Sequence, residues 1–235
     1  MEPRALTDDT CGTLTIGHDL VVRRMGFGAM RLTGEGVWGR PSDPAAAAAV
    51  LRRAVELGVN FIDTADAYGP DVNEEDLADA LHPYPNDVVI ETKGGLVRQG
   101  PGQWGPAGHP DHLRQACEGS LGRLRLDTID LYQLHRPDPA VPFAESVGAL
   151  ADLRTEGKIR HVGLSNVSVE QLREAQAIVP VASVQNVYNL FNREHEAVLR
   201  ECEASGLAFL PYFPLAGGDF KTAVDVLTEI GKQHA

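Results

Sequence analysis

The stretch FIDTADAYG, residues 61–69, decides which fold this chain adopts. An apolar run ends at Asp63, and Tyr68 follows five residues later, beside a glycine-proline break. Such a run predicts a buried strand followed by a turn that carries polar groups. Two later runs end in the same way: VVIETKGG, residues 88–95, delivers Lys93, and LYQLHRPD, residues 131–138, delivers His135. We therefore expect Asp63, Tyr68, Lys93 and His135 at the carboxyl ends of three strands.

The remaining segments alternate between strand and helix patterns. Asp43-Pro44 is an N-cap followed by proline at the first helical position, and Ser168 to Gln171 is a capping box. Strands joined by helices of this length must be parallel. The expected elements are a hairpin at 13–22 that could plug a barrel, a short buried strand at 25–30, further strands at 159–165, 181–187 and 207–212, and helices at 43–57, from 73, 110–124, 142–156, from 168, 192–205 and 222–233.

Regular alternation of this kind predicts an α/β fold of the (β/α)8 TIM-barrel type, with reactive groups at the carboxyl ends of its strands. We expect a single domain over residues 1–235, since the two loops dense in proline and glycine, 34–44 and 100–110, are too short to be linkers. By this count the chain supplies seven βα units. We expect the eighth unit to be missing.

The composition excludes several classes of protein. A formal net charge of −12 with dispersed basic residues argues against a nucleic-acid-binding surface. No run reaches the length of a membrane span, and residues 1–10 lack the apolar core of a signal peptide, so we expect a cytoplasmic protein without membrane partners. Three widely spaced cysteines predict neither a disulfide framework nor a metal site. We expect a monomer or a weak oligomer.

A dinucleotide-binding fingerprint and the catalytic pair of the short-chain dehydrogenases both fail to fit this sequence. Gly26 and Gly28 begin like a dinucleotide fingerprint, but Arg31 stands where its third glycine belongs and a loop is expected after it. The tyrosine-lysine pair of short-chain dehydrogenases needs a lysine four residues after the tyrosine, and none of the five tyrosines has one. A catalytic tyrosine and lysine in this chain must therefore meet across strands.

The four polar residues suit carbonyl reduction. This reaction needs a hydride donor and an acid that protonates the carbonyl oxygen. Tyr68 can be that acid if the ammonium of Lys93 lowers its pKa, which is ordinarily about 10. Asp63 would keep Lys93 charged, and His135 would orient the carbonyl oxygen. Taken singly, each residue has a simpler explanation: a structural ion pair, a packed tyrosine, or a surface or core histidine.

The motifs DTADAYG, ETKGG and LHRPD together resemble those of the aldo-keto reductases, and the resemblance extends from near residue 12 to about residue 230. The resemblance implies an NADP-dependent oxidoreductase that reduces an aldehyde or ketone, with Asp63, Tyr68, Lys93 and His135 as its catalytic residues. The nearest branch is bacterial and pyridoxal reductase-like, which makes pyridoxal a candidate substrate.

The resemblance also implies a set of cofactor-binding residues. Ser165, Asn166 and Gln185 would bond the nicotinamide carboxamide, and Tyr212 would stack on its ring. Alternatively, Ser165 and Asn166 are only turn residues before the helix at Ser168. Phe213 departs from the serine common in the family. The full implied set is Gly28, Met30, Ser165, Asn166, Gln185, Tyr212, Pro214, Leu215 and Gly217.

Two hypotheses remain open at this level. In the family, residues after strand eight hold the 2′-phosphate of NADPH, and we expect that region to be absent here. The chain is therefore either an NADP-dependent carbonyl reductase or a catalytically impaired remnant of a barrel that acts through protein contacts. In the first case, the loops with Trp38 and Trp104 would select the substrate, unless these side chains only anchor the loops.

Overall fold

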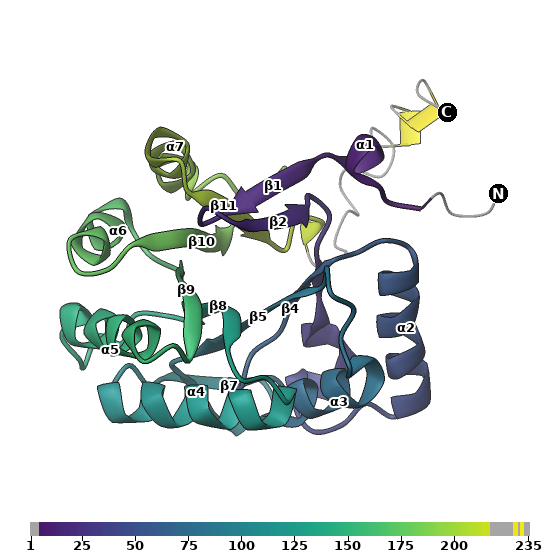
Figure 1. The fold of residues 1–235 in the computed structure, drawn as a ribbon, viewed down its shortest axis with the longest axis horizontal. Coiled ribbons are helices and arrows are strands. Elements are labelled where there is room, and N and C mark those ends of the chain that lie inside the picture. The colour runs from purple at the N-terminus through teal and green to yellow at the C-terminus, as the bar shows by residue number, and fades with distance from the viewer. Residues whose placement is uncertain (1–4, 217–227, 230, 233–235) are drawn as a thin grey trace.

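Seven parallel strands form the centre of the fold. The structure is a computed structural model and describes residues 5–216, 228, 229, 231 and 232. The strands lie in the order β11-β10-β9-β8-β5-β4-β3. This curled sheet with helices outside it is a TIM-barrel-like α/β fold (Figure 1). The strands are β3 (Phe27–Gly28), β4 (Phe61–Asp63), β5 (Val89–Gly94), β8 (Ile129–Leu134), β9 (Ile159–Ser165), β10 (Val181–Val187) and β11 (Ala208–Tyr212).

The helices connect the strands and cover their outer side. The Asp43 carboxylate accepts a hydrogen bond from the Ala46 N–H, and the capping box of Ser168 and Gln171 is formed, both as predicted. The largest core cluster lies between β8, β9 and β10 and their helices, and includes buried Cys117 and Cys202. The helices are α1 (Asp8–Cys11), α2 (Pro44–Glu56), α3 (Val72–Leu81), α4 (Pro110–Leu124), α5 (Phe143–Thr155), α6 (Val169–Gln176) and α7 (Glu196–Ser205).

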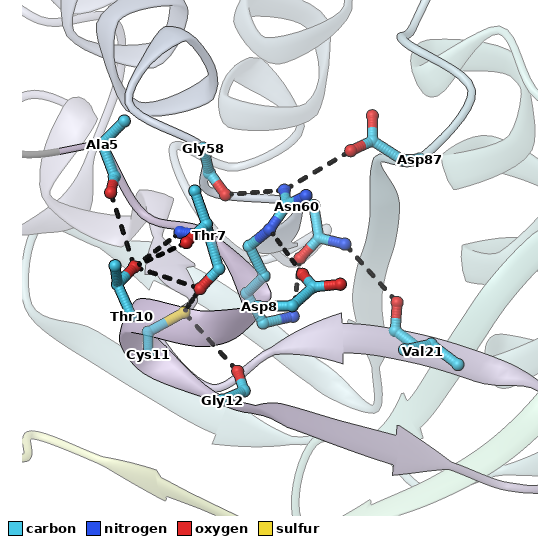
Figure 2. Close-up of polar contacts among 11 residues, drawn as sticks. Ala5, Thr7, Asp8, Thr10, Cys11, Gly12, Val21, Gly58, Asn60 and Asp87 are labelled. Atoms are coloured by element: carbon cyan, nitrogen blue, oxygen red, sulfur yellow. Dashed lines mark hydrogen bonds and ion pairs between the residues drawn. The ribbon is translucent and has the colours of Figure 1, made fainter.

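An N-terminal hairpin fills one end of the sheet's interior, as predicted. It consists of β1 (Thr13–Ile16) and β2 (Leu20–Arg23), and its buried Ile16, Leu20 and Val22 pack in one cluster with side chains of β4, β5, β8, β10 and β11. Asn60 fixes the hairpin by accepting a hydrogen bond from the Arg23 N–H (2.8 Å) and donating one to the Val21 carbonyl (3.4 Å) (Figure 2). The hairpin therefore closes the side of the sheet opposite the strands' carboxyl ends.

Three expected elements differ in the structure. The strand predicted at 25–30 is only β3, because Met25 is 57% exposed and a 3-10 helix, η1 (Ala29–Leu32), follows Gly28. The helix predicted from Asn192 begins at Glu196, since the Asn192 side chain accepts the Glu194 N–H in a local turn instead. The loop after Lys93 contains a hairpin, β6 (Leu96–Gly100) and β7 (Gln103–Pro106).

The prediction about an eighth unit concerns the end of the chain. Within the described residues the parallel sheet has seven strands, with β3 and β11 at its edges. Most of the helix predicted at 222–233 lies outside the described residues. None of the described helices combines the length and the apolar character that crossing a bilayer requires.

Candidate active site

The structure brings the four predicted catalytic residues together. Asp63 is the last residue of β4, Lys93 lies near the end of β5, and His135 follows β8 directly. These three strands are neighbours in the sheet, so their carboxyl ends meet at one edge. Tyr68 reaches the same place from the loop between β4 and α3 and packs its ring edge-to-face against His135, with 5.7 Å between the ring centroids.

Lys93 lies at the centre of this group. Its side chain is fully buried, and its ammonium contacts the Asp63 carboxylate and donates to the Thr64 carbonyl at 2.9 Å. Burial would lower the pKa of Lys93, but the attraction of Asp63, Tyr68 and Glu91 outweighs burial and raises this pKa above its ordinary value. Lys93 is therefore a permanent cation beneath Tyr68, whose ring centroid lies 5.5 Å from the ammonium nitrogen.

Tyr68 differs from the expectation in its acidity. We expected Lys93 to lower the pKa of Tyr68, and it does act in that direction, but burial raises this pKa further than the ammonium lowers it. A negative charge on Asp63 or on Glu91 also raises it. The net pKa of Tyr68 thus lies above its ordinary value, because the ring is only 7% exposed and two carboxyl groups lie close by. Tyr68 consequently holds its proton at neutral pH.

His135 is a buried, neutral imidazole. Burial lowers its pKa well below the ordinary value, and the positive charges of Lys93 and Arg136 lower it further. The ring nitrogen Nδ1 is buried and has no hydrogen-bond partner within the described part of the chain. Two hydrogen bonds fix the backbone of His135: its N–H donates to the Gly94 carbonyl, and its carbonyl accepts from Asn166 Nδ2. This imidazole can therefore hydrogen-bond a polar atom placed beside Tyr68.

Sequence reasoning missed a second carboxyl group beside Lys93. Glu91 is fully buried on β5, and its Oε1 lies 3.5 Å from the Lys93 ammonium. The same oxygen accepts hydrogen bonds from Gln133 Nε2 (2.5 Å) and Gln185 Nε2 (2.9 Å). The spacing of Glu91 and Lys93, two residues apart in a predicted strand, was a signal for this, since such residues share a face. We call Asp63, Glu91, Lys93, Gln133 and Gln185 the inner network.

The residues predicted to hold the nicotinamide lie at the ends of β9, β10 and β11. Asn166 has a left-handed backbone (φ 59°) and donates to Ser165 Oγ (2.9 Å), while its Oδ1 accepts the Tyr212 hydroxyl (2.8 Å). This leaves the Ser165 hydroxyl as a donor and Asn166 Oδ1 with a second lone pair, a combination that suits an amide. Gln185 instead points its amide nitrogen inward, to Asp63 (2.7 Å) and Glu91.

The other implied cofactor residues frame the same edge. Gly28 pairs with Asp63 in the sheet register, and a side chain at Gly28 would meet no atom within 4 Å, so the space above it is open. Met30 lies in η1, while Pro214 and Leu215 are exposed after β11. Gly217 lies outside the described residues.

Arg98 joins the two loops expected to select the substrate. Its guanidinium stacks on Trp104 at 3.6 Å from the ring centroid and lies 5.8 Å from that of Trp38. It also donates to the carbonyl oxygens of Gly36 (2.7 Å) and Val37 (2.6 Å). Trp104 in turn packs edge-to-face on Tyr68, with 6.3 Å between centroids. The two loops thus form one wall of the site, beside the predicted proton donor.

Comparisons with known proteins identify the family of this chain. Residues 24–234 match the aldo/keto reductase family. An uncharacterized oxidoreductase of Schizosaccharomyces pombe is 50% identical over 228 residues, which cover 97% of this chain and 74% of the relative. Pyridoxine 4-dehydrogenase of Escherichia coli is 40% identical over 212 residues, which cover 87% of this chain and 73% of the relative.

A solved structure shows the same architecture. The aldo/keto reductase of Klebsiella pneumoniae in complex with NADP and acetate superposes with a TM-score of 0.76 at 26% identity, covering 94% of this chain and 76% of that one. The match to the family spans the inner network, Tyr68 and His135, and all seven strands of the parallel sheet. The chain belongs to the aldo/keto reductase family of NAD(P)H-dependent oxidoreductases.

Proposed function

We propose that this protein reduces an aldehyde or ketone to an alcohol with NADPH, and that Tyr68 is the proton donor. The observation that carries the proposal is the position of Tyr68, between the buried ammonium of Lys93 and the neutral imidazole of His135. A carbonyl oxygen that approaches the tyrosine hydroxyl would meet a proton donor at a place where negative charge is stabilised by a cation.

Each residue has a distinct role in the proposed reaction. Tyr68 keeps its proton until the carbonyl oxygen gains negative charge, and Lys93 stabilises the phenolate that proton transfer leaves behind. Asp63 holds Lys93 in place through its ion pair. Neutral His135 hydrogen-bonds the carbonyl oxygen and so fixes the orientation of the substrate.

NADPH supplies the hydride when it is bound. Ser165 and Asn166 would bind its carboxamide, and Tyr212 would offer a ring face at the end of β11. Support comes from the free donor and acceptor capacity of Ser165 and Asn166, the open space at Gly28, and the Klebsiella pneumoniae relative solved with NADP.

The substrate class is proposed from the wall of the site. Trp104, stacked on Arg98, offers an aromatic surface beside Tyr68. An aromatic aldehyde suits this surface, and similarity to pyridoxine 4-dehydrogenase makes pyridoxal a first compound to test. The rival hypothesis of an impaired remnant gains no support from the comparisons.

The test is a binding titration followed by a turnover assay. Quenching of tryptophan fluorescence should give micromolar or tighter binding of NADPH, and weaker binding of NADH. Oxidation of NADPH should then depend on an added aldehyde, with pyridoxal among a panel of aromatic and small aliphatic compounds. A folded protein that binds neither nucleotide would contradict the proposal.

A further inference from the structure

Glu91 is a buried acid for which the proposed reaction has no role so far. Its side chain is 0% exposed, and both of its amide donors, Gln133 and Gln185, bond the same oxygen, Oε1. The other oxygen, Oε2, is buried and has no partner within the described part of the chain. A carboxylate would leave this oxygen charged and unsolvated, which is costly, whereas a neutral acid carries its proton there.

Its surroundings are built to hold an uncharged group. Two other buried oxygens in the same layer also lack partners among the described residues, Gln133 Oε1 and Ser183 Oγ. Gly163 leaves room for both side chains, since a Cβ there would lie 2.6 Å from Ser183 Oγ and 2.7 Å from Gln133 Cγ. The amide side chain of Gln133, which bonds Glu91, is uncharged and supplies no positive charge to balance a carboxylate at Glu91.

The charges around Glu91 also favour its neutral form. The pKa of Glu91 is raised to about 8, because the raising effects of burial and of the Asp63 carboxylate outweigh the lowering effect of the Lys93 ammonium. The titratable groups that face it are Asp63 on β4, Lys93 on β5 and Tyr68 above them, while β8 and β10 contribute only the amides of Gln133 and Gln185. Lys93 is already paired with Asp63 and cannot neutralise two carboxylates at once.

We propose that Glu91 is a positioning residue that carries a proton during turnover, and that losing this proton weakens Tyr68 as an acid. The inference rests on the proposed function of Tyr68. With Glu91 neutral, Lys93 balances Asp63 alone and its field favours proton release from Tyr68. With Glu91 ionised, a second negative charge 3.5 Å from the ammonium opposes that release.

The first test is the pH profile of kcat for aldehyde reduction, from about pH 6 to about pH 10. The wild type should lose about tenfold in kcat as Glu91 titrates near pH 8. Glu91→Gln, which keeps the shape of the side chain and cannot ionise, should lose the alkaline decline, so that its kcat stays constant from about pH 6 to about pH 10. The matched control is Glu74→Gln, another fully buried acid, which should keep the decline. An alkaline decline that persists in Glu91→Gln, or an equal loss of rate at every pH, would overturn the inference.

The second test reads the proton directly and does not need activity. Infrared spectroscopy at neutral pH should show a protonated carboxylic acid that titrates near pH 8, both in the wild type and in Asp66→Asn, which lacks another buried acid with a raised pKa. Its absence overturns the inference even if Glu91→Gln fails to fold. Failure of the proposed function gives a different result, because Tyr68→Phe would then keep turnover. If Tyr68→Phe loses turnover but Glu91→Gln has the same pH profile as the wild type, only the role of Glu91 is rejected.

Discussion

Two clusters of buried charge lie on opposite faces of β5, and only one of them resembles an active site. The inner network holds Lys93 between two carboxyl groups. On the other face, Thr92 bonds the fully buried Glu74 of α3 (2.5 Å), which pairs with Arg123 of α4 (2.7 Å), and Arg123 also reaches Asp71 (3.0 Å). We call these four residues the outer network. Burial and charge pairing are common to both, so neither property identifies function.

What separates them is the direction of the side chains. Successive residues of a strand point to opposite faces, so Glu91 and Lys93 point to the sheet's interior and Thr92 points toward the helices. Arg123 keeps 19% of its side chain exposed, whereas Lys93 has none. The outer network joins α3, α4 and β5, and none of the described tyrosine rings stacks over Arg123. It therefore stabilises the fold, while we propose that the inner network positions a reacting group.

The largest expected effect is that of Tyr68→Phe. Removing one hydroxyl should lower kcat for aldehyde reduction by about 10³-fold, or about 4 kcal/mol of activation free energy, since the general acid is lost. Fluorescence titration should give an unchanged Kd for NADPH. A parallel loss of cofactor affinity would show that Tyr68 shapes the site and does not act as its acid.

Arg123→Met should lower stability and leave activity unchanged, the reverse of Tyr68→Phe. It leaves Glu74 buried without its cation and should lower the free energy of unfolding by about 3 kcal/mol, with kcat unchanged at temperatures where the variant is folded. Urea unfolding and steady-state rates measure both. Arg114→Met is the matched control on α4, because its partners Asp152 and Glu156 are 61% and 40% exposed, and it should cost less than about 1 kcal/mol. If Arg123→Met lowers kcat instead, the two networks are coupled through β5.

Trp104→Ala should separate substrate binding, to which the wall of the site contributes, from the chemical step, to which the inner network contributes. We expect KM for aromatic aldehydes to rise about tenfold, equivalent to about 1.4 kcal/mol, because the wall beside Tyr68 is lost, while kcat changes little. KM for a small aliphatic aldehyde should stay nearly constant. Arg98→Met should reproduce part of the effect, since the guanidinium holds Trp104 in place. An equal change in KM for both aldehydes would mean that Trp104 stabilises the loop and does not contact the substrate.

Much of the inner network could be predicted from sequence, and the outer one could not. Strand ends are local signals, so Asp63, Lys93 and His135 could be placed at one edge from their apolar runs alone. Glu91 escaped because β5 is buried on both faces and carries polar residues on both, so only the two-residue spacing from Lys93 indicated which face Glu91 occupies. The pKa of Tyr68 depends on burial by distant segments, and the stack of Arg98 on Trp104 joins loops that no local pattern connects.

The smallest effect concerns Asp66, an acid near the outer network with one buried oxygen that lacks a partner within the described residues. Burial raises its pKa well above the ordinary value, and the charge of Glu74 raises it further. A carboxyl group with a raised pKa in the folded state stabilises the fold below its unfolded pKa, and this contribution is lost as the pH rises through the folded pKa.

Asp66→Asn should therefore match the wild type near pH 4 and become more stable by about 1 kcal/mol at alkaline pH, where the wild type must bury an unpaired charged oxygen. Urea unfolding across this range measures the difference, and the other buried acids cancel because both proteins contain them. A constant difference at every pH would mean that Asp66 finds a partner for its charge. In that case burial alone would not separate the outer network, which stabilises the fold, from the inner network, for which we propose a role in proton transfer.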